Sequence, residues 1–251
     1  MQLHTHTWGA GDRVALLIHG IMADHRTWRR VGPALADLGY RVVAVDLRGH
    51  GRSGRAASYT ARDHADDLAE TLPTGADLAV GHSLGGLTLS LAVERLAPRR
   101  AVYSDPAWHL GTPDNGFDPA QFAEFRSVAT RERIEQLNPR WEREDVDIEL
   151  ATLAVWDEAS AFGLAGPAGT AGSSGSAGSS GSSGSGGTDL LPAKPVVPSL
   201  VQRADGSSLV SAEQARILTS RGFEVRTVTG AGHTIHRDDF GAFMASLEGW
   251  V

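Results

Sequence analysis

The stretch AVGHSLGGLTL (79–89) places one serine between glycines at the point where an apolar run ends. Gly81 precedes Ser83 by two residues, and Gly85 and Gly86 follow it. Glycine on both sides of a serine is typical of a turn too tight for larger side chains. Where such a turn joins a strand to a helix, the serine projects from a strained corner, a useful position for a nucleophile. The stretch therefore predicts a strand, a sharp turn and a helix, with Ser83 at the corner.

Short apolar runs that end at Gly, Asp or His predict further strands along the chain. With the first one they cover 13–20, 41–49, 77–83, 100–106, 197–205 and 223–233. Amphipathic segments between them predict helices at 25–38, 60–72, 84–97, 211–221 and 238–250. Near-continuous apolar strands joined through helices indicate an α/β fold, a mostly parallel central sheet with helices on both faces.

The interval 107–196 is far longer than an ordinary connection, whose median is about 4–6 residues. Its first part predicts helices over 118–160, beginning at the capping pair Asp118 and Pro119. Its second part is almost wholly Gly, Ser, Ala and Thr, a composition that predicts a flexible coil. Such purity is typical of an engineered linker, but a natural low-complexity insert has the same composition. We therefore expect a core of 1–106 and 197–251, a helical insertion of 107–165 and a Gly/Ser-rich linker of 166–188.

Composition narrows the class of protein. The 251 residues suffice for one α/β domain with a modest insertion, and the net charge, 23 − 30 = −7, argues against a nucleic-acid surface. With no cysteine, disulfides, thiolate metal sites and cysteine nucleophiles are excluded. The first residues lack the apolar core of a signal peptide, and no apolar run approaches the roughly 20 residues that span a bilayer. We expect a cytoplasmic protein without nucleic-acid or membrane partners.

Four motifs resemble the landmarks of the α/β-hydrolase family, in that family's order. They are HGIM (19–22), DLRGHGRS (46–53), GHSLGG (81–86) and GAGHTIH (230–236). The resemblance covers the core segments, and the insertion stands where many members carry a helical cap over the active site. It implies a serine hydrolase with Ser83 as nucleophile that requires no cofactor and no metal.

His233 is the candidate general base among ten histidines. It lies just beyond the last predicted strand, in a Gly-flanked loop that can bring an imidazole over Ser83. The family's histidine falls at the same place. His236 is the nearest rival, but HRDDF (236–240) predicts the start of a helix. We expect His82, next to the serine in sequence, to point away from the site.

The other histidines have structural explanations. His19 is expected to shape a turn, and His50 and His64 to be structural or solvated. His4 and His6 alternate on an expected N-terminal strand and share one face, which is able to bind a metal weakly. Exposed histidines on an edge strand explain that pattern better. Asp46 and Arg48 are expected to organise neighbouring loops through hydrogen bonds to the backbone.

Acyl transfer also requires N–H donors for the oxyanion of the tetrahedral intermediate. Leu84 follows the nucleophile and supplies one backbone N–H at the start of a helix. The resemblance places the second donor at Ile21, in the loop after the first core strand. Met22 is expected either to line the pocket entrance or to pack in the core.

The acid that orients the base has two candidates at strand ends between Ser83 and His233. Many family members carry it after the later strand, but alignment to that pattern puts Ser207 in its place, with Asp205 two residues early. Asp105 ends the strand after the elbow helix, where other members carry an acid. Its neighbour Pro106 is expected to hold it in an extended conformation. We assign the acid to Asp105, with Asp205 as the alternative.

These residues predict a serine hydrolase that cleaves a carboxylic ester, lactone or thioester through an acyl-enzyme on Ser83, with a small acyl compound as substrate. A cofactor-free perhydrolase, a carbon–carbon hydrolase and a non-catalytic ligand-binding protein on the same fold are the alternatives. An epoxide hydrolase or a dehalogenase is disfavoured, because members of the resembled family with those activities use aspartate where this chain has Ser83. The aromatic residues near and in the insertion either wall a substrate pocket or pack the insertion: Trp108, Phe117, Phe122, Phe125, Trp141, Trp156 and Phe162.

Overall fold

The computed structural model describes residues 1–110, 118–165 and 188–251. The expectations for Phe117 and for the Gly/Ser-rich segment, apart from Thr188, therefore lie outside the described residues.

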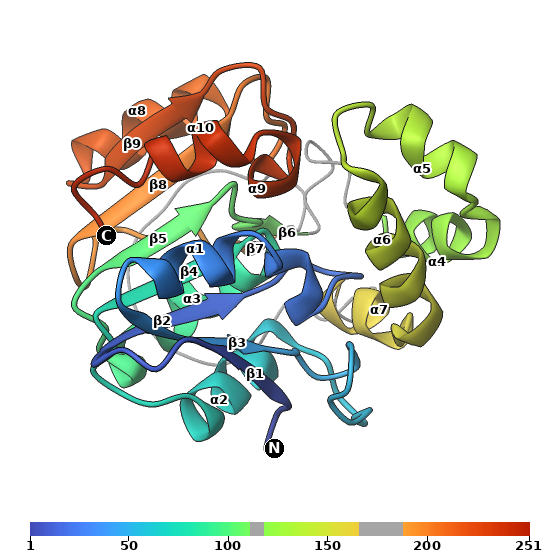
Figure 1. Ribbon diagram of the computed structural model, residues 1–251, viewed down its shortest axis with the longest axis horizontal. Helices are drawn as coiled ribbons and strands as arrows, with labels where there is room; N and C mark the ends of the chain where they lie inside the picture. The colour runs from blue at the N-terminus through green and yellow to red at the C-terminus, as the bar shows by residue number, and fades with distance from the viewer. Residues whose placement is uncertain (111–117, 166–187) are drawn as a thin grey trace, which may run out of the picture.

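A seven-stranded sheet runs through the molecule in the order β1-β3-β2-β4-β5-β8-β9 (Figure 1). All neighbouring strands in it pair in parallel except β1, which is antiparallel to β3 at one edge. The strands are β1 (Thr5–Trp8), β2 (Arg13–Ile18), β3 (Tyr40–Val45), β4 (Leu78–His82), β5 (Ala101–Ser104), β8 (Ser199–Ala204) and β9 (Glu224–Val228). The predicted mostly parallel sheet is confirmed. A separate pair joins β6 (His109–Leu110) to β7 (Thr188–Asp189).

Successive side chains of each strand point to opposite faces of the sheet and form two apolar cores, one on each face. Leu16 and Ile18 belong to the core beneath helices α2 (Ala61–Thr71), α3 (Leu84–Leu96) and α8 (Ala212–Ser220). Ala15 and Leu17 belong to the opposite core, beneath α1 (Val31–Asp37) and α10 (Phe240–Ala245). Both faces of the sheet are covered, as the continuous apolar strands predict.

The insertion forms four helices in its described part, α4 (Pro119–Val128), α5 (Arg131–Leu137), α6 (Arg143–Val155) and α7 (Ala159–Ala165). They gather to one side of the sheet (Figure 1). Asp118 caps α4 as predicted, because its carboxylate accepts a hydrogen bond from the Ala120 N–H. None of the helices in the described ranges is long and apolar enough to cross a bilayer.

Two of the predicted helices are broken. The segment 25–38 contains a 3-10 helix, η1 (His25–Trp28), and then α1. Pro33 explains the break, because a proline is tolerated only in the first turn of a helix, so α1 begins near Val31. The segment 238–250 contains the end of α9 (Ile235–Asp238) and then α10, separated by Asp239, whose side chain caps α10.

Candidate active site

The residue at the corner between β4 and α3 is Ser83. Its backbone adopts φ 52°, ψ −117°, in a region that non-glycine residues rarely occupy, and its N–H donates to the Ser104 carbonyl at 3.0 Å. That bond ties the corner to β5. The side chain lines a cavity at the carboxyl end of the sheet and stays accessible from it. The predicted strand, turn and helix are confirmed.

The glycines around Ser83 allow backbone segments to approach closely. A Cβ on Gly81 would lie 2.4 Å from the Gly85 carbonyl oxygen, and one on Gly85 would lie 2.2 Å from the Ile18 carbonyl oxygen. Both distances are shorter than any tolerated contact. The glycines therefore let α3 start directly against the end of β2, which fixes the position of Ser83.

Asp105 and His233 meet although 128 residues separate them in the chain. The Nδ1 of His233 lies 2.7 Å from Oδ2 of Asp105, and the other carboxylate oxygen accepts from the Ala204 N–H at 3.2 Å. Asp105 is almost fully buried, while the His233 side chain stays 44 % exposed. His233 and Ser83 line the same cavity. A buried carboxylate in this position holds the imidazole through Nδ1. It leaves Nε2 able to accept a proton from another group.

The expected extended conformation of Asp105 is wrong. Its φ is +42°, in the left-handed region, although Pro106 follows it. Its N–H donates to the Gln202 carbonyl at 2.7 Å, and its carboxylate bonds Ala204 and His233. These tertiary contacts outweigh the local preference that a proline imposes on its predecessor, at a residue type that tolerates positive φ.

The alternative candidates at the end of β8 make other contacts. The Asp205 carboxylate receives the Gly230 N–H at 3.5 Å, and its own N–H donates to the Val228 carbonyl. The Ser207 hydroxyl accepts from the N–H groups of Leu209 and Val210, both at 3.0 Å. Both side chains stabilise the turns around them.

His82 lies in the site, contrary to the expectation that it points away. Its Nε2–H donates to the His233 carbonyl at 3.0 Å, and the two imidazoles lie 4.7 Å apart. The loop after β9 folds over the end of β4, which brings that carbonyl within reach. Burial holds the pKa of His82 well below its usual range, so the ring is neutral. His82 thus fixes the backbone of His233. The only hint of this role in the sequence is that His82 is the neighbour of Ser83.

The loop after β2 is held by His19, which is fully buried. Its Nδ1–H donates to the Gly20 carbonyl at 2.7 Å, and its Nε2 accepts the Leu47 N–H at 2.9 Å. Both nitrogens are used, so the predicted structural role is confirmed. The loop lies close to Ser83, since a Cβ on Gly20 would be 3.1 Å from the Ser83 Cβ. Ile21 follows in this loop and lines the cavity with Leu84.

The cavity, of ≈ 440 Å³, lies between the sheet and the insertion. The insertion contributes Phe122, Phe125 and Trp141 to its wall, and Met22 lines it from the loop after β2. Trp108 and Trp156 are fully buried in packing, and Phe162 is largely exposed. Of the two explanations for the aromatic residues, lining of the pocket applies to Phe122, Phe125 and Trp141. Packing applies to Trp108 and Trp156.

A buried ion pair joins α6 of the insertion to α9 of the core. Arg237, only 4 % exposed, bonds the Glu149 carboxylate at 2.7 Å and the Asp145 carbonyl. Its guanidinium also lies 3.5 Å from the centre of the Trp141 ring. The Trp141 Nε1–H donates to Asp238 at 2.8 Å. These contacts hold one wall of the cavity against the segment that follows His233.

The remaining predicted structural histidines are buried. His50 and His64 each donate Nδ1–H to a nearby carbonyl, of Arg48 and Thr60 respectively. Burial lowers the pKa of His64 to about 4. His236 lies in the first turn of α9, stacks on Trp28 with ring centres 4.3 Å apart, and is held neutral by burial, which lowers its pKa.

Residues 15–246 match the alpha/beta hydrolase family, and the chain therefore belongs to it. Solved structures of the same fold include an N-formylmaleamic acid deformylase from Pseudomonas putida (TM-score 0.76, 21 % identity, 98 % of this chain and 95 % of that one). An enol-lactonase from Burkholderia xenovorans has a TM-score of 0.72 at 21 % identity, covering 99 % of this chain and 95 % of that one.

Curated relatives match in sequence over a shorter part. A pimeloyl-[acyl-carrier protein] methyl ester esterase from Sodalis glossinidius is 37 % identical over 95 residues, which is 38 % of this chain and 36 % of that protein. The matched part is about a quarter to two fifths of the length of the first such relatives.

Proposed function

We propose that this protein is a serine hydrolase that cleaves a carboxylic ester through an acyl-enzyme on Ser83. The observation that carries the proposal is the 2.7 Å contact between His233 Nδ1 and Asp105, at a cavity that Ser83 also lines. A serine at a strained corner, a partly exposed imidazole and a buried carboxylate behind it are the three groups that nucleophilic acyl transfer requires.

In this mechanism the Ser83 hydroxyl attacks the carbonyl carbon, and Nε2 of His233 takes its proton. Asp105 keeps the proton of the neutral imidazole on Nδ1 and stabilises the imidazolium that forms. His233 then protonates the leaving alcohol as the carbon–oxygen bond breaks. Water, deprotonated by the same imidazole, attacks the acyl-enzyme and releases the acid and free Ser83.

We assign the oxyanion hole to the backbone N–H groups of Ile21 and Leu84. Leu84 is the first residue of α3, so its N–H has no partner within the helix, and the helix dipole favours negative charge there. Support for Ile21 comes from its loop, which His19 fixes beside Ser83.

The cavity supports a small substrate with an apolar acyl or alcohol group. Its volume of ≈ 440 Å³ and its lining by Met22, Phe122, Phe125 and Trp141 suit such a ligand. The relative named as a methyl ester esterase supports an ester as the bond that is cleaved.

Labelling with a fluorophosphonate followed by mass spectrometry tests the nucleophile. We expect the label on Ser83, and Ser83→Ala should lower turnover of p-nitrophenyl esters by about 10⁴–10⁶-fold. Ser90→Ala is the matched control, because Ser90 lies on the same helix and bonds Trp108 instead of lining the cavity. A label on another serine, or turnover that survives in Ser83→Ala, would refute the assignment.

A further inference from the structure

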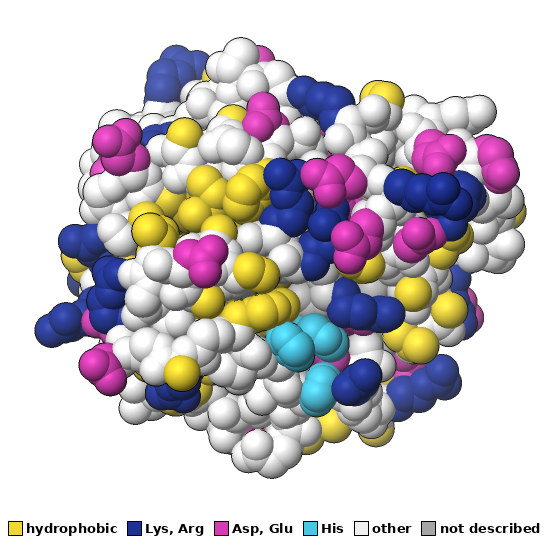
Figure 2. Space-filling view, in the orientation of Figure 1, with side chains coloured by type: hydrophobic (Ala, Val, Ile, Leu, Met, Phe, Trp, Pro, Cys, Tyr) yellow, Lys and Arg dark blue, Asp and Glu magenta, His cyan; other side chains and the backbone are white. Residues whose placement is uncertain are grey.

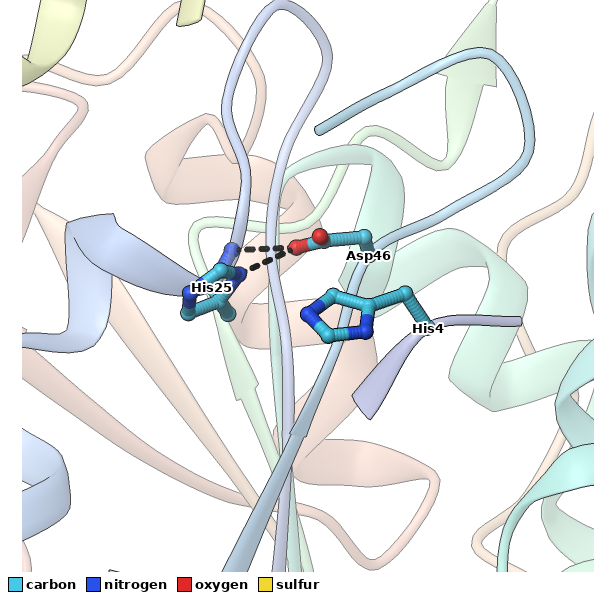
Figure 3. Close-up of side chains that lie close together, drawn as sticks. All are labelled: His4, His25 and Asp46. Atoms are coloured by element: carbon cyan, nitrogen blue, oxygen red, sulfur yellow. Dashed lines mark hydrogen bonds and ion pairs between the residues drawn. The ribbon is translucent and has the colours of Figure 1, made fainter. Parts of the chain in front are cut away.

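Two histidines and one aspartate meet at the edge of the sheet, outside the cavity beside Ser83. His4 directly precedes β1, His25 opens η1, and Asp46 directly follows β3. One donor atom from each side chain lies within 4.8 Å of the others. Figure 3 shows the His4 imidazole reaching toward the pair that His25 and Asp46 form. Segments far apart in the chain thus present three good metal-binding groups to one point.

The backbone around these side chains is held in place by hydrogen bonds. The Asp46 N–H donates to the His4 carbonyl at 2.9 Å, and the His4 N–H donates to the Ser53 hydroxyl at 2.8 Å. That hydroxyl in turn donates to the Asp46 carbonyl at 2.6 Å. His4 and Asp46 are therefore fixed to each other independently of any ligand.

The Asp46 carboxylate is held in one orientation. Its Oδ1 accepts from the His25 N–H and lies 2.8 Å from the His25 Nδ1, and its Oδ2 accepts from the Arg52 N–H at 3.0 Å. The side chain is fully buried, so these hydrogen bonds fix the direction in which its oxygens point.

His4 supplies the observation that a hydrogen-bond network alone does not explain. Its Nε2 is buried and has no hydrogen-bond partner among the residues that the structure describes. A buried polar atom without a partner costs free energy, and a bound ion would remove that cost. Histidines gather on the surface at this side of the molecule (Figure 2), and His6 stacks on His25 with ring centres 5.0 Å apart.

We propose that His4, His25 and Asp46 form a binding site for a divalent transition-metal ion, with Zn²⁺ as the best fit. Two imidazole nitrogens and one carboxylate oxygen are a donor set that Zn²⁺ prefers, and water can complete a tetrahedron. Metal–donor distances of about 2.0–2.2 Å bring donors closer together than 4.8 Å, so the ring of His4 must move inward by roughly 1 Å. His4 is the least buried of the three side chains.

The ion would add a bond between three segments that already meet through hydrogen bonds and ring contacts. His25 lies four residues after Ile21, so the site also anchors the far end of the loop to which we assign an oxyanion donor. Its chemistry is separate from the proposed reaction, since none of the three ligands lines the cavity.

Titration of the tag-free, chelator-treated chain with Zn²⁺ by calorimetry tests the site. We expect one Zn²⁺ per chain and a Kd that rises about 10-fold or more in His4→Ala and in His25→Gln, because even an outer-shell change typically weakens metal binding about 10–100-fold. Saturating Zn²⁺ should raise the Tm of the wild type but not that of His4→Ala. His4→Ala removes a partly buried side chain, and circular dichroism checks that it folds.

His6→Ala and His233→Ala are the matched controls. His6 contacts His25 without belonging to the ligand set, and His233 belongs to the cavity, so both variants should keep the wild-type Kd within about threefold. If His6→Ala weakens binding while His25→Gln does not, the ion is chelated by the N-terminal strand alone and the proposal is wrong. Loss of binding in His233→Ala places the ion at the cavity and overturns the proposal equally. Absence of Zn²⁺ binding to the wild type does the same.

Discussion

Asp105 adopts a conformation that its own neighbourhood in the sequence disfavours. The residue before a proline avoids the left-handed region, yet Asp105 lies there because Gln202, Ala204 and His233 together hold its backbone and carboxylate. Strain of this kind persists where the surroundings over-determine a residue and is concentrated at functional sites. The proposed role of the carboxylate agrees with that pattern.

Replacement of Asp105 measures this role. We expect Asp105→Asn to lower kcat for ester hydrolysis by about 10³–10⁴-fold with little change in the far-UV spectrum, because an amide favours the wrong imidazole tautomer. Asp205→Asn is the matched control and should cost less than about tenfold, since Asp205 contacts the turn at Gly230 and not His233. The opposite ranking would assign the acid to Asp205.

Gly85 sets the distance between α3 and β2. We expect Gly85→Ala to lower the free energy of unfolding by at least about 1–3 kcal/mol, because the new Cβ would lie 2.2 Å from the Ile18 carbonyl oxygen. Urea denaturation measures the change. Gly241→Ala provides the comparison, since its Cβ would meet nothing closer than 3.6 Å and lies in helix α10. Equal stability of the two variants would show that the backbone at Gly85 has room to adjust.

At the scale of elements, the sequence predicted the segments whose signals are local. Asp118 before Pro119 and Ser211 before α8 mark helix starts, and both caps are present. The breaks at Pro33 and Asp239 also have local causes. Apolar residues continue at helical spacing across both positions, so the spacing alone does not show where one helix ends and the next begins. The position of β1 beside β3 rests on pairing between distant residues, which periodicity alone does not specify.

The candidate site follows the same division. Ser83 and His233 stand in motifs with a fixed place relative to a strand end. The choice between Asp105 and Asp205 depends on where two strand ends meet in space. The contact of His82 with His233 depends on how the loop after β9 folds back. The contact of His4 with His25 depends on where η1 lies relative to the edge strand β1. None of these contacts has a signature within one segment.

One of the contacts between the insertion helices and the core is a fully formed buried ion pair, Arg237–Glu149, which stands beside the ion pairs that Arg29 makes with the start of α6. We expect Arg237→Met to lower the free energy of unfolding by about 3–5 kcal/mol, because Glu149 would remain largely buried without its partner. The double variant Arg237→Met/Glu149→Leu should recover much of that loss. Thermal and urea denaturation measure both changes.

The matched control for that pair is Arg95→Met, which breaks an exposed ion pair with Asp66 and should cost about 0–1 kcal/mol. If Arg237→Met is as stable as Arg95→Met, the other contacts of α6, among them the Arg29–Asp145 ion pair, hold it to the core and the Arg237–Glu149 pair adds nothing measurable.

At the scale of the whole molecule, buried neutral histidines make stability depend on pH. Burial lowers the pKa of His19, His50, His64, His82 and His236. For His64 the pKa falls from 6.5 to about 4. Between these values the unfolded chain binds a proton that the folded chain does not, so stability decreases as pH falls through 6.5.

We therefore expect the Tm to be highest above pH 7 and to fall steadily from pH 7 to pH 5. His64→Gln, which cannot take up a proton, should flatten this dependence, since His64 alone accounts for up to roughly 2 kcal/mol between pH 7 and pH 5. Thermal denaturation at half-unit steps of pH compares the two proteins. Parallel curves would mean that the folded chain protonates His64 without cost.

The position of the insertion between β5 and β8 divides the chemistry of the molecule in two. Ser83 and Asp105 precede it and His233 follows it, while β5 and β8 pair side by side from Ala101 and Ser199. With the roles proposed for these residues, a chain cut within 166–187 would give one piece with the nucleophile and the acid and another with the base. On that proposal neither piece hydrolyses an ester alone, so hydrolysis would signal that the two pieces have associated. The fold thus has the layout of a split reporter, with strand pairing as the recognition step and a coloured product as the readout.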